Sequence, residues 1–359
     1  MMKILIACNV DSYSNPYLKT LYNGFVQQGI DVTCSIEEFW NNVNSYDIVH
    51  IQWPNLLVDE LDDTCKRLKS VIVKIKQHKI PLVCTCHNLK PHYNTCKAIN
   101  NTYRVVYNNC DYIHHLGEAS IQLLKDLYPD ITAKHIVIPH HTYDEIYNFD
   151  ISKDEARKKL GIPQNVNCIL SFGSFRHDEE RKLLINLSKK MRKQNVYFLA
   201  PGFYRSVILR KNIFLALIAL YNTIKYSIVA KFNNIHICHD YVSDNDLPYY
   251  LKAADVMLIQ RVKILNSGNV SLAMLAGLPI VGPDDGNVGA ILKDTGNFVF
   301  DPKNQNNLSS LIQLALTSKY VGDLNRKYAE SNLTTISVVK QLINFYTYIF
   351  NFESEPTTD

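Results

Sequence analysis

Several features are missing from this sequence of 359 residues, and each absence excludes a class of protein. No Cys-x-x-Cys pair of the kind found in zinc sites occurs, and the nine cysteines are an odd number, so we expect reduced thiols in a cytosolic protein. The apolar run at residues 3–8 ends at Asn9 and is too short for a secretion signal or a membrane span. No repeat or low-complexity segment is present.

A strong excess of one charge is missing as well. The formal net charge of +4 gives little support for nucleic-acid binding, although it suits an acidic ligand such as a nucleoside diphosphate. Hydrophobic residues make up 47% of the chain and charged residues 20%, as in ordinary globular proteins. Because 359 residues exceed the usual size of one core, we expect two domains of roughly 100 to 200 residues each.

Short apolar runs alternate with amphipathic stretches along the whole chain, and this alternation predicts β-α-β units with parallel sheets. In the first half we predict strands at residues 3–8, 31–35, 47–52, 81–86, 112–116 and 135–139. In the second half we predict strands at residues 167–173, 195–200, 234–238, 255–260, 278–282 and 297–300. The predicted fold class is therefore α/β.

A polar stretch at residues 148–163 interrupts this alternation and marks a domain boundary near residue 150. Within it, Ser152 and Glu155 have the spacing of a capping box, which predicts a short helix at the start of the second half. We therefore predict a first domain at residues 1–150 and a second at 151–337, with an apolar terminal helix at 338–350 that packs back on the first domain.

Two predicted strands of the first domain lead into histidine-containing sequences, Asp47-Ile-Val-His50-Ile-Gln-Trp53 and Thr85-Cys-His87-Asn88. These sequences resemble the Asp-hydrophobic-Val-His-x-His and Thr-x-His-Asp elements of the GT-B glycosyltransferase family usually called family 4, or group 1. The resemblance implies two Rossmann-like domains that face each other across a cleft, with His87 in contact with the transferred sugar there. It gives His50 a similar but weaker role. For both residues the alternative is a histidine held by local packing and hydrogen bonds.

The end of the first domain contains a second resemblance, in Gly117-Glu-Ala-Ser-Ile and His135-Ile-Val-Ile-Pro-His-His141. It implies that Gly117 and Glu118 begin a helix that points into the cleft and contacts sugar or acceptor. Asn15 lies in the segment that replaces the family's Gly-Gly loop, and it is a further possible contact. His140 and His141 are expected to point to opposite faces of an extended segment, which makes them a poor metal site, so we predict no metal and no cofactor.

The most specific resemblance lies at residues 266–281, which are similar to the family's donor-binding loop and helix. The loop itself is Asn266-Ser267-Gly268-Asn269. A Ser-Gly turn directly before an apolar helix presents backbone N–H groups and the positive end of the helix dipole, which suits a pyrophosphate. An ordinary N-cap is the alternative for Asn266 and Ser267.

A diphosphate also needs basic side chains, because one helix end cannot neutralise its charge. Arg176 and Lys182 are the candidates, in a segment similar to the family's Gly-Arg…Lys-Gly element. Arg181 could replace Lys182, and Arg261 or Lys263 could contribute from the segment before the donor loop. Ordinary solvated charges are the alternative for each of them.

The sequence also departs from the family. The two glutamates that the family places eight residues apart correspond to Ile264 and Leu272, so neither the donor nor the anomeric outcome follows from the resemblance. An unusual insert at Phe203 to Lys231 has an apolar body with basic edges, and Asn222 and Lys225 interrupt it before it reaches the ~20 residues needed to span a membrane. It fits a helix at an anionic membrane surface or a helix packed on the second domain.

The favoured function is hexose transfer from a UDP- or GDP-sugar to a glycan or lipid-linked acceptor in bacterial surface polysaccharide synthesis. We expect the protein in the cytoplasm, or peripheral at the inner face of the cell membrane. A nucleotide-sugar epimerase is one alternative, with Asp284 and Asp285 as its carboxylates, although this pair is interpreted more simply as a turn after the predicted strand that ends at Gly282. A nucleotide-sugar-binding module without catalysis is the other, and the missing glutamate pair favours it.

Overall fold

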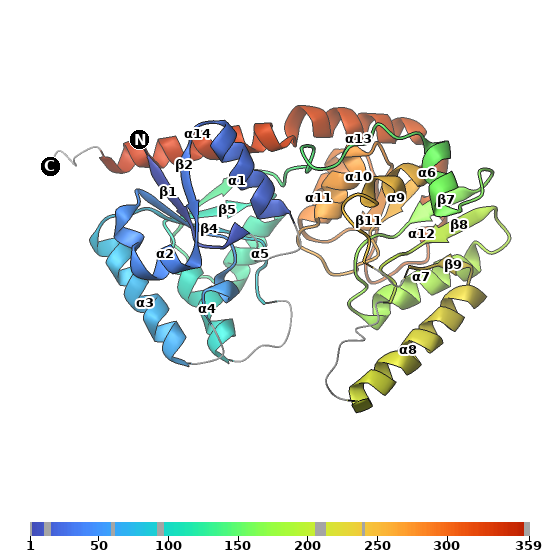
Figure 1. The fold of residues 1–359 in the computed structure, drawn as a ribbon, viewed down its shortest axis with the longest axis horizontal. Helices are drawn as coiled ribbons and strands as arrows, with labels where there is room; N and C mark the ends of the chain where they lie inside the picture. The colour runs from blue at the N-terminus through green and yellow to red at the C-terminus, as the bar shows by residue number, and fades with distance from the viewer. Residues whose placement is uncertain are drawn as a thin grey trace. The chain divides into compact units, whose positions relative to one another are not determined.

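The computed structural model describes residues 2–10, 16–58, 62–91, 97–204, 213–238 and 241–354. The chain forms two compact units (Figure 1). Unit 1 comprises Met1–Tyr143 and Asn332–Asp359, and unit 2 comprises Asp144–Ser331. Each unit contains one parallel sheet of six strands covered by helices.

The sheet of unit 1 has the strand order β2-β1-β3-β4-β5-β6. Its strands are β1 (Lys3–Ile6), β2 (Asp31–Cys34), β3 (Ile48–Ile51), β4 (Leu82–Thr85), β5 (Tyr112–His115) and β6 (Lys134–Val137). Between them lie the helices α1 (Tyr17–Gln27), α2 (Ile36–Asn41), α3 (Asp62–Gln77), α4 (Lys97–Tyr107) and α5 (Ala119–Leu127). The central strands β3, β4 and β5 are buried along their whole length, as expected for a sheet with helices on both faces.

Unit 1 also contains the terminal helix α14 (Thr335–Ser354). This helix crosses α1 closely, because a Cβ atom on Gly24 would lie 2.7 Å from the Val339 Cγ2 atom. Further along α14, the Phe345 ring packs edge-on against Tyr112 of β5 at a centroid distance of 5.5 Å. The buried face of α14 therefore completes the core of unit 1.

The sheet of unit 2 has the order β12-β11-β10-β7-β8-β9. Its strands are β7 (Asn167–Leu170), β8 (Val196–Leu199), β9 (Ile235–His236), β10 (Val256–Leu258), β11 (Ile280–Pro283) and β12 (Phe298–Phe300). Its helices are α6 (Lys153–Leu160), α7 (Asp178–Lys190), α8 (Ile213–Phe232), α9 (Leu247–Ala253), α10 (Gly268–Leu275), α11 (Gly286–Asp294), α12 (Leu308–Thr317) and α13 (Lys319–Asn332). Each predicted strand of the chain thus overlaps one observed strand, although β6 begins one residue before its predicted range and β11 ends one residue after its own.

The predicted capping at Ser152 is confirmed, because its hydroxyl accepts a hydrogen bond from the Glu155 N–H at 3.2 Å. The same helix, α6, carries the buried Arg157, whose guanidinium bonds the Asp255 carboxylate at 2.6 Å and the Ala253 carbonyl at 3.1 Å. A buried cation needs such partners, since leaving it unpaired is costly. These bonds attach α6 to the start of β10.

No helix within the described part of the chain is both long and apolar enough to pass through a bilayer.

Candidate active site

In unit 1, polar side chains at the carboxyl ends of β3 and β4 form one buried chain of hydrogen bonds. His114 Nε2 lies 2.8 Å from the Ile138 carbonyl, which can only accept, so this nitrogen donates. Burial lowers the pKa of His114 to about 4, so the ring is neutral at pH 7 and its Nδ1 accepts from the Thr85 hydroxyl at 3.1 Å.

The chain continues through His50. Because the Thr85 hydroxyl donates to His114, its oxygen accepts from His50 Nε2 at 2.8 Å. Burial keeps the pKa of His50 well below its usual value, so the neutral ring accepts at Nδ1 from the Tyr346 hydroxyl at 2.5 Å. His50 is fully buried with both ring nitrogens engaged, which favours the packing interpretation over a ligand contact.

His87 follows β4 and is only half-buried. Its Nε2 lies 2.9 Å from Gln52 Oε1, so this nitrogen donates when the amide is oriented as assigned. Its ring stacks on Trp53 at a centroid distance of 4.4 Å and meets the edge of Tyr17 at 5.1 Å. Burial lowers the pKa of His87 well below 6.5, with smaller contributions from neighbouring histidines. The result is a neutral, oriented imidazole that can bond a hydroxyl.

The predicted arrangement of His140 and His141 is wrong. Their rings do not point to opposite faces, since both lie against Tyr17 at 4.9 Å and their own centroids are 5.3 Å apart. Side chains alternate only within a strand, and β6 ends at Val137, three residues earlier. Among the described residues, no three His, Cys, Asp or Glu side chains form a group that could hold a metal ion.

The remaining predicted contacts of unit 1 lie near the start of α5. This helix begins at Ala119, directly after Gly117 and Glu118, as the sequence predicted. Glu118 is exposed, and the Gly117 carbonyl accepts a hydrogen bond from the Ser120 hydroxyl at 2.8 Å. Asn15 lies outside the described residues.

In unit 2, the loops after β7 and before α10 converge. Ser267 is the N-cap residue of α10, but its side chain accepts no hydrogen bond from the first turn of that helix within the described structure. Asn269 in the first turn donates from Nδ2 to the Phe172 carbonyl at 3.0 Å. Next to it, Gly173 has φ 95° and leaves no room for a Cβ atom, which would lie 2.9 Å from that amide nitrogen.

The loop after β8 also approaches closely at this point. A Cβ atom on Gly202 would collide with the Gly173 carbonyl, and the Gly202 carbonyl accepts from the Phe175 N–H at 3.1 Å. Both loops therefore require glycine. They pack against each other, and the Phe175 hydrogen bond attaches the segment that leads to Arg176 to them.

A buried carboxylate orders this segment. Glu180 is 1% exposed; its Oε2 accepts from the Arg176 N–H at 2.8 Å and its Oε1 lies 3.4 Å from Arg261 Nε. Arg261 also donates to the Ser174 carbonyl at 3.2 Å. Glu180 could not be identified as a site residue from the sequence. In the sequence it is only one of the acidic residues in the first turn of α7. The Arg176 and Lys182 side chains are exposed and accessible to an anion.

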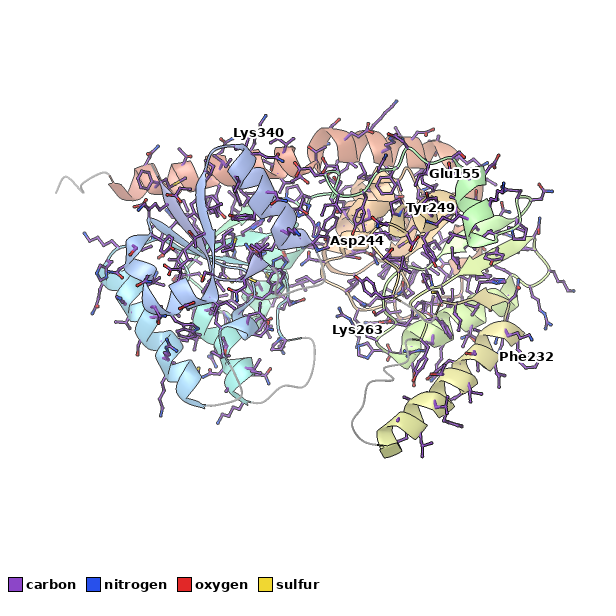
Figure 2. All side chains as sticks on the ribbon, in the orientation of Figure 1. Glu155, Phe232, Asp244, Tyr249, Lys263 and Lys340 are labelled. Atoms are coloured by element: carbon purple, nitrogen blue, oxygen red, sulfur yellow. The ribbon has the colours of Figure 1, made fainter. Side chains whose placement is uncertain are left out.

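Arg181 has a structural position instead. It donates to the Phe203 carbonyl at 3.0 Å and to the Phe175 carbonyl at 2.7 Å, so its guanidinium joins α7 to two loops. Lys263 lies on the segment before α10 and is exposed (Figure 2). Arg261 and Lys263 both precede the donor loop in the chain. Lys263 is the more accessible of the two, since the Arg261 side chain is only 22% exposed.

The donor loop itself is held by the start of α11. Asp285 accepts from the Ile264 N–H at 2.7 Å, and Asn287 donates from its side chain to Asn266 Oδ1 at 2.8 Å. Asp284 pairs with Lys293 at 2.8 Å. These carboxylates have structural partners, which weakens the epimerase alternative.

The positions of the family's two glutamates are apolar and buried. Ile264 is 7% exposed and Leu272 6% exposed, so both side chains belong to the core around α10 rather than to its exposed loop.

Residues 152–333, just over half of the chain, match the sequence model of the family described as glycosyl transferases group 1. The chain is a group 1 glycosyltransferase. The match contains Arg176, Lys182 and the donor loop, whereas His50, His87 and Gly117 lie outside it. The narrower assignment to family 4 remains a prediction.

Solved structures give the fold of this glycosyltransferase. Sucrose-phosphate synthase from Thermosynechococcus elongatus superposes with a TM-score of 0.73 at 13% identity, covering 98% of this chain and 100% of that one. HepE from Anabaena, in complex with UDP-glucose, has a TM-score of 0.66 at 13% identity, covering 97% and 100%. WaaG, a glycosyltransferase involved in lipopolysaccharide biosynthesis, has a TM-score of 0.59 at 13% identity, covering 96% and 100%. The fold is GT-B. A sequence comparison with curated proteins finds no match.

Proposed function

We propose that this glycosyltransferase transfers a hexose from a UDP- or GDP-sugar to a glycan or lipid-linked acceptor in bacterial surface polysaccharide synthesis. The observation that carries the proposal is the loop cluster of unit 2, where the first turn of α10 has no side-chain cap from Ser267 and exposed cations lie on the neighbouring elements. HepE binds UDP and UDP-glucose, and WaaG acts in lipopolysaccharide biosynthesis, which supports a nucleotide-sugar donor and a surface glycan.

In this proposal the donor diphosphate binds at Ser267, Gly268 and Asn269. The first-turn N–H groups of α10 and the positive end of its dipole stabilise the negative charge that develops on the departing phosphate. Arg176 and Lys182 add cationic side chains from the segment that begins α7. Because these groups supply the positive charge, we propose that transfer needs no metal ion and no cofactor.

His87 acts on the sugar. With its Nε2 proton donated to Gln52, the neutral imidazole has Nδ1 to accept a hydrogen bond from a sugar hydroxyl, and its stacking on Trp53 fixes the direction of that nitrogen. Since the bond depends on the position of the sugar, it can strengthen as the sugar carbon separates from the diphosphate, which would accelerate transfer. Gly117 and Glu118 are proposed to contact the acceptor or sugar from the start of α5.

We place this reaction in the cytoplasm, with the residues from Phe203 to Lys231 bringing the enzyme to the inner face of the membrane. A lipid-linked acceptor would be found at that surface.

The second candidate is a nucleotide-sugar-binding module without catalysis. Ile264 and Leu272 favour it, because two buried apolar side chains stand where the family has carboxylates. Such a module would still bind a nucleotide-sugar at the α10 loop and would release no product.

The test follows nucleotide release from UDP-glucose and GDP-mannose, each with and without lipid-linked or glycan acceptors. A thermal-shift screen first selects the base, because a nucleotide at 100 times its Kd stabilises the fold by about 2.7 kcal/mol. Acceptor-dependent release supports transfer. Binding without release under any acceptor supports the module, and formation of an epimeric donor without acceptor supports the epimerase.

A further inference from the structure

Helix α8 lies on the outside of unit 2 (Figure 1). It exposes large apolar side chains that the rest of unit 2 does not cover. Tyr221 is 65% exposed and Phe232, at the end of the helix, 76% exposed (Figure 2). We call five of the exposed side chains, which share one side of the helix, the α8 stripe; it consists of Leu217, Tyr221, Ile224, Ile228 and Phe232. Ile218 and Leu220 are also exposed and lie on the two flanks of this stripe. Single exposed apolar residues are ordinary, but five along one helix are a contiguous patch of the kind that marks an interaction surface.

The stripe occupies one side of the helix and has cations along both of its edges. At about 100° per residue, the five side chains fall within an arc of about 80°. Lys231 and Lys225 are exposed and fall about 20° beyond the two edges of that arc. An apolar stripe bordered by lysines is typical of a helix that lies in the surface of a bilayer, where long basic side chains reach the head groups.

The opposite side of α8 packs on unit 2 and holds the stripe outward. Ala219 and Ala230 are buried there. Tyr226 stacks on Tyr204 at a centroid distance of 4.8 Å, and its hydroxyl donates to Asp178 at 3.2 Å. Because both sides of α8 are apolar while only one is packed, the outward side has no role in the core of unit 2.

The surrounding sequence decides between possible occupants. Between Glu180 and Asp240 the chain has no acidic residue but eleven lysines and arginines, including Arg205, Arg210 and Lys211 just before α8. A second copy of the chain on this stripe would bring like charges together across a two-fold axis. An anionic bilayer instead attracts the exposed Lys225 and Lys231 of α8.

We propose that the α8 stripe inserts into the surface of an anionic lipid bilayer, with the helix axis in the membrane plane and Lys225 and Lys231 at the head groups. The inference deepens the proposed function, because it identifies the side chains that bring the donor unit to a lipid-linked acceptor. Its physical basis is exposure and charge, neither of which depends on transfer chemistry.

The test compares two double variants of the full chain with matched chemistry. Ile224→Glu with Ile228→Glu changes residues of the stripe that are 52% and 50% exposed. Leu314→Glu with Leu324→Glu changes two residues on α12 and α13 that are each 51% exposed. Both pairs add the same charge and remove similar exposed apolar surface from unit 2, so loss of folding is equally improbable in each.

Sedimentation is measured with phosphatidylcholine vesicles that contain or lack phosphatidylglycerol. We expect the wild type and the α12–α13 variant to bind the anionic vesicles, the α8 variant to bind at least tenfold more weakly, and added salt to weaken binding. Equal vesicle binding by the two variants overturns the proposal. The proposal is also overturned if the wild type does not bind vesicles but forms a dimer that the α8 variant does not form. Calorimetry with UDP and GDP separates this failure from failure of the donor site, since the α8 variant should keep wild-type nucleotide affinity.

Discussion

The two units differ in the polar groups that they place at the carboxyl ends of their strands. Unit 1 has buried, neutral histidines, and nine of the 12 histidines of the chain precede residue 142. Their hydrogen bonds run through Thr85, His50 and Tyr346 inside the core. Unit 2 has loops that require glycine and carry exposed cations such as Arg176 and Lys263.

This difference separates two kinds of recognition. Neutral groups with fixed donors and acceptors suit the hydroxyls of a sugar, since direction rather than charge selects among them. Exposed cations and helix N–H groups suit a diphosphate, which carries charge in every orientation. If the two units differ in this way, acid or the loss of a single side chain should affect one unit and leave the other nearly unchanged.

Acid should destabilise unit 1 more than unit 2. Burial lowers the pKa of His114 and His140 to about 4, whereas an unfolded histidine titrates near 6.5. Between these values the unfolded chain binds protons that the folded chain does not, so stability is complete above pH 6.5 and is lost as the pH falls towards 4. At pH 5 each of these two histidines should cost about 2 kcal/mol.

Tryptophan fluorescence measures this loss selectively, because Trp40 and Trp53, the 2 tryptophans of the chain, both belong to unit 1. Urea unfolding followed at pH 7 and pH 5 should show a large fall in the free energy of unfolding. The protection of unit 2 amides against hydrogen exchange, relative to an unfolded chain at the same pH, should change less between pH 7 and pH 5. Equal losses in the two units would show that the buried histidines do not control acid stability.

Removal of the Tyr346 hydroxyl should destabilise unit 1 without touching any exposed surface. Tyr346→Phe leaves His50 Nδ1 without its donor in a fully buried site, and an unmade buried hydrogen bond costs about 1–3 kcal/mol. Tyr348→Phe is the matched control on the same helix, since this residue is 55% exposed. Urea unfolding followed by fluorescence should separate the two variants; identical midpoints would mean that the hydrogen-bond chain contributes nothing to stability.

Removal of one cation from unit 2 should affect only the charged part of a ligand. Arg176→Ala should weaken nucleoside diphosphate binding by about tenfold or more, because charge-assisted hydrogen bonds contribute about 1.5–3 kcal/mol and this side chain is exposed. Nucleoside binding should not change. Lys189→Ala, at the far end of α7, is the control and should bind both ligands as the wild type does. Calorimetry that finds equal weakening of nucleoside and nucleotide would remove Arg176 from the phosphate site.

The fold could be predicted from the sequence because both sheets are buried. Strands such as Val196–Leu199 and Val256–Leu258 are continuous apolar runs between amphipathic stretches, and this pattern depends on neighbours in the sequence. The start of α6 at Ser152 and of α5 after Glu118 could be predicted for the same reason.

The details of the site depend on contacts between distant residues and could not be predicted. Gln52 meets His87 across 35 residues, and Glu180 meets Arg261 across 81. Nothing near Glu180 in the sequence distinguishes it from the exposed carboxylates beside it in the same first turn. The sequence also could not predict that α8 is exposed, because an apolar helix has the same sequence pattern in a protein core and at a membrane surface.

We infer that the diphosphate binds at the start of α10 while His87 acts on the sugar, and one pair of variants separates these two roles. His87→Ala should lower turnover by about 100-fold, as loss of a group that acts in the transition state does, and leave nucleoside diphosphate affinity near wild type. Gly268→Val should instead weaken nucleotide binding, because the valine side chain shields the backbone N–H groups. His78→Ala, an exposed histidine of unit 1, should match the wild type in both measurements. Wild-type turnover in His87→Ala, or a loss of nucleotide affinity as large as that of Gly268→Val, would contradict the claim.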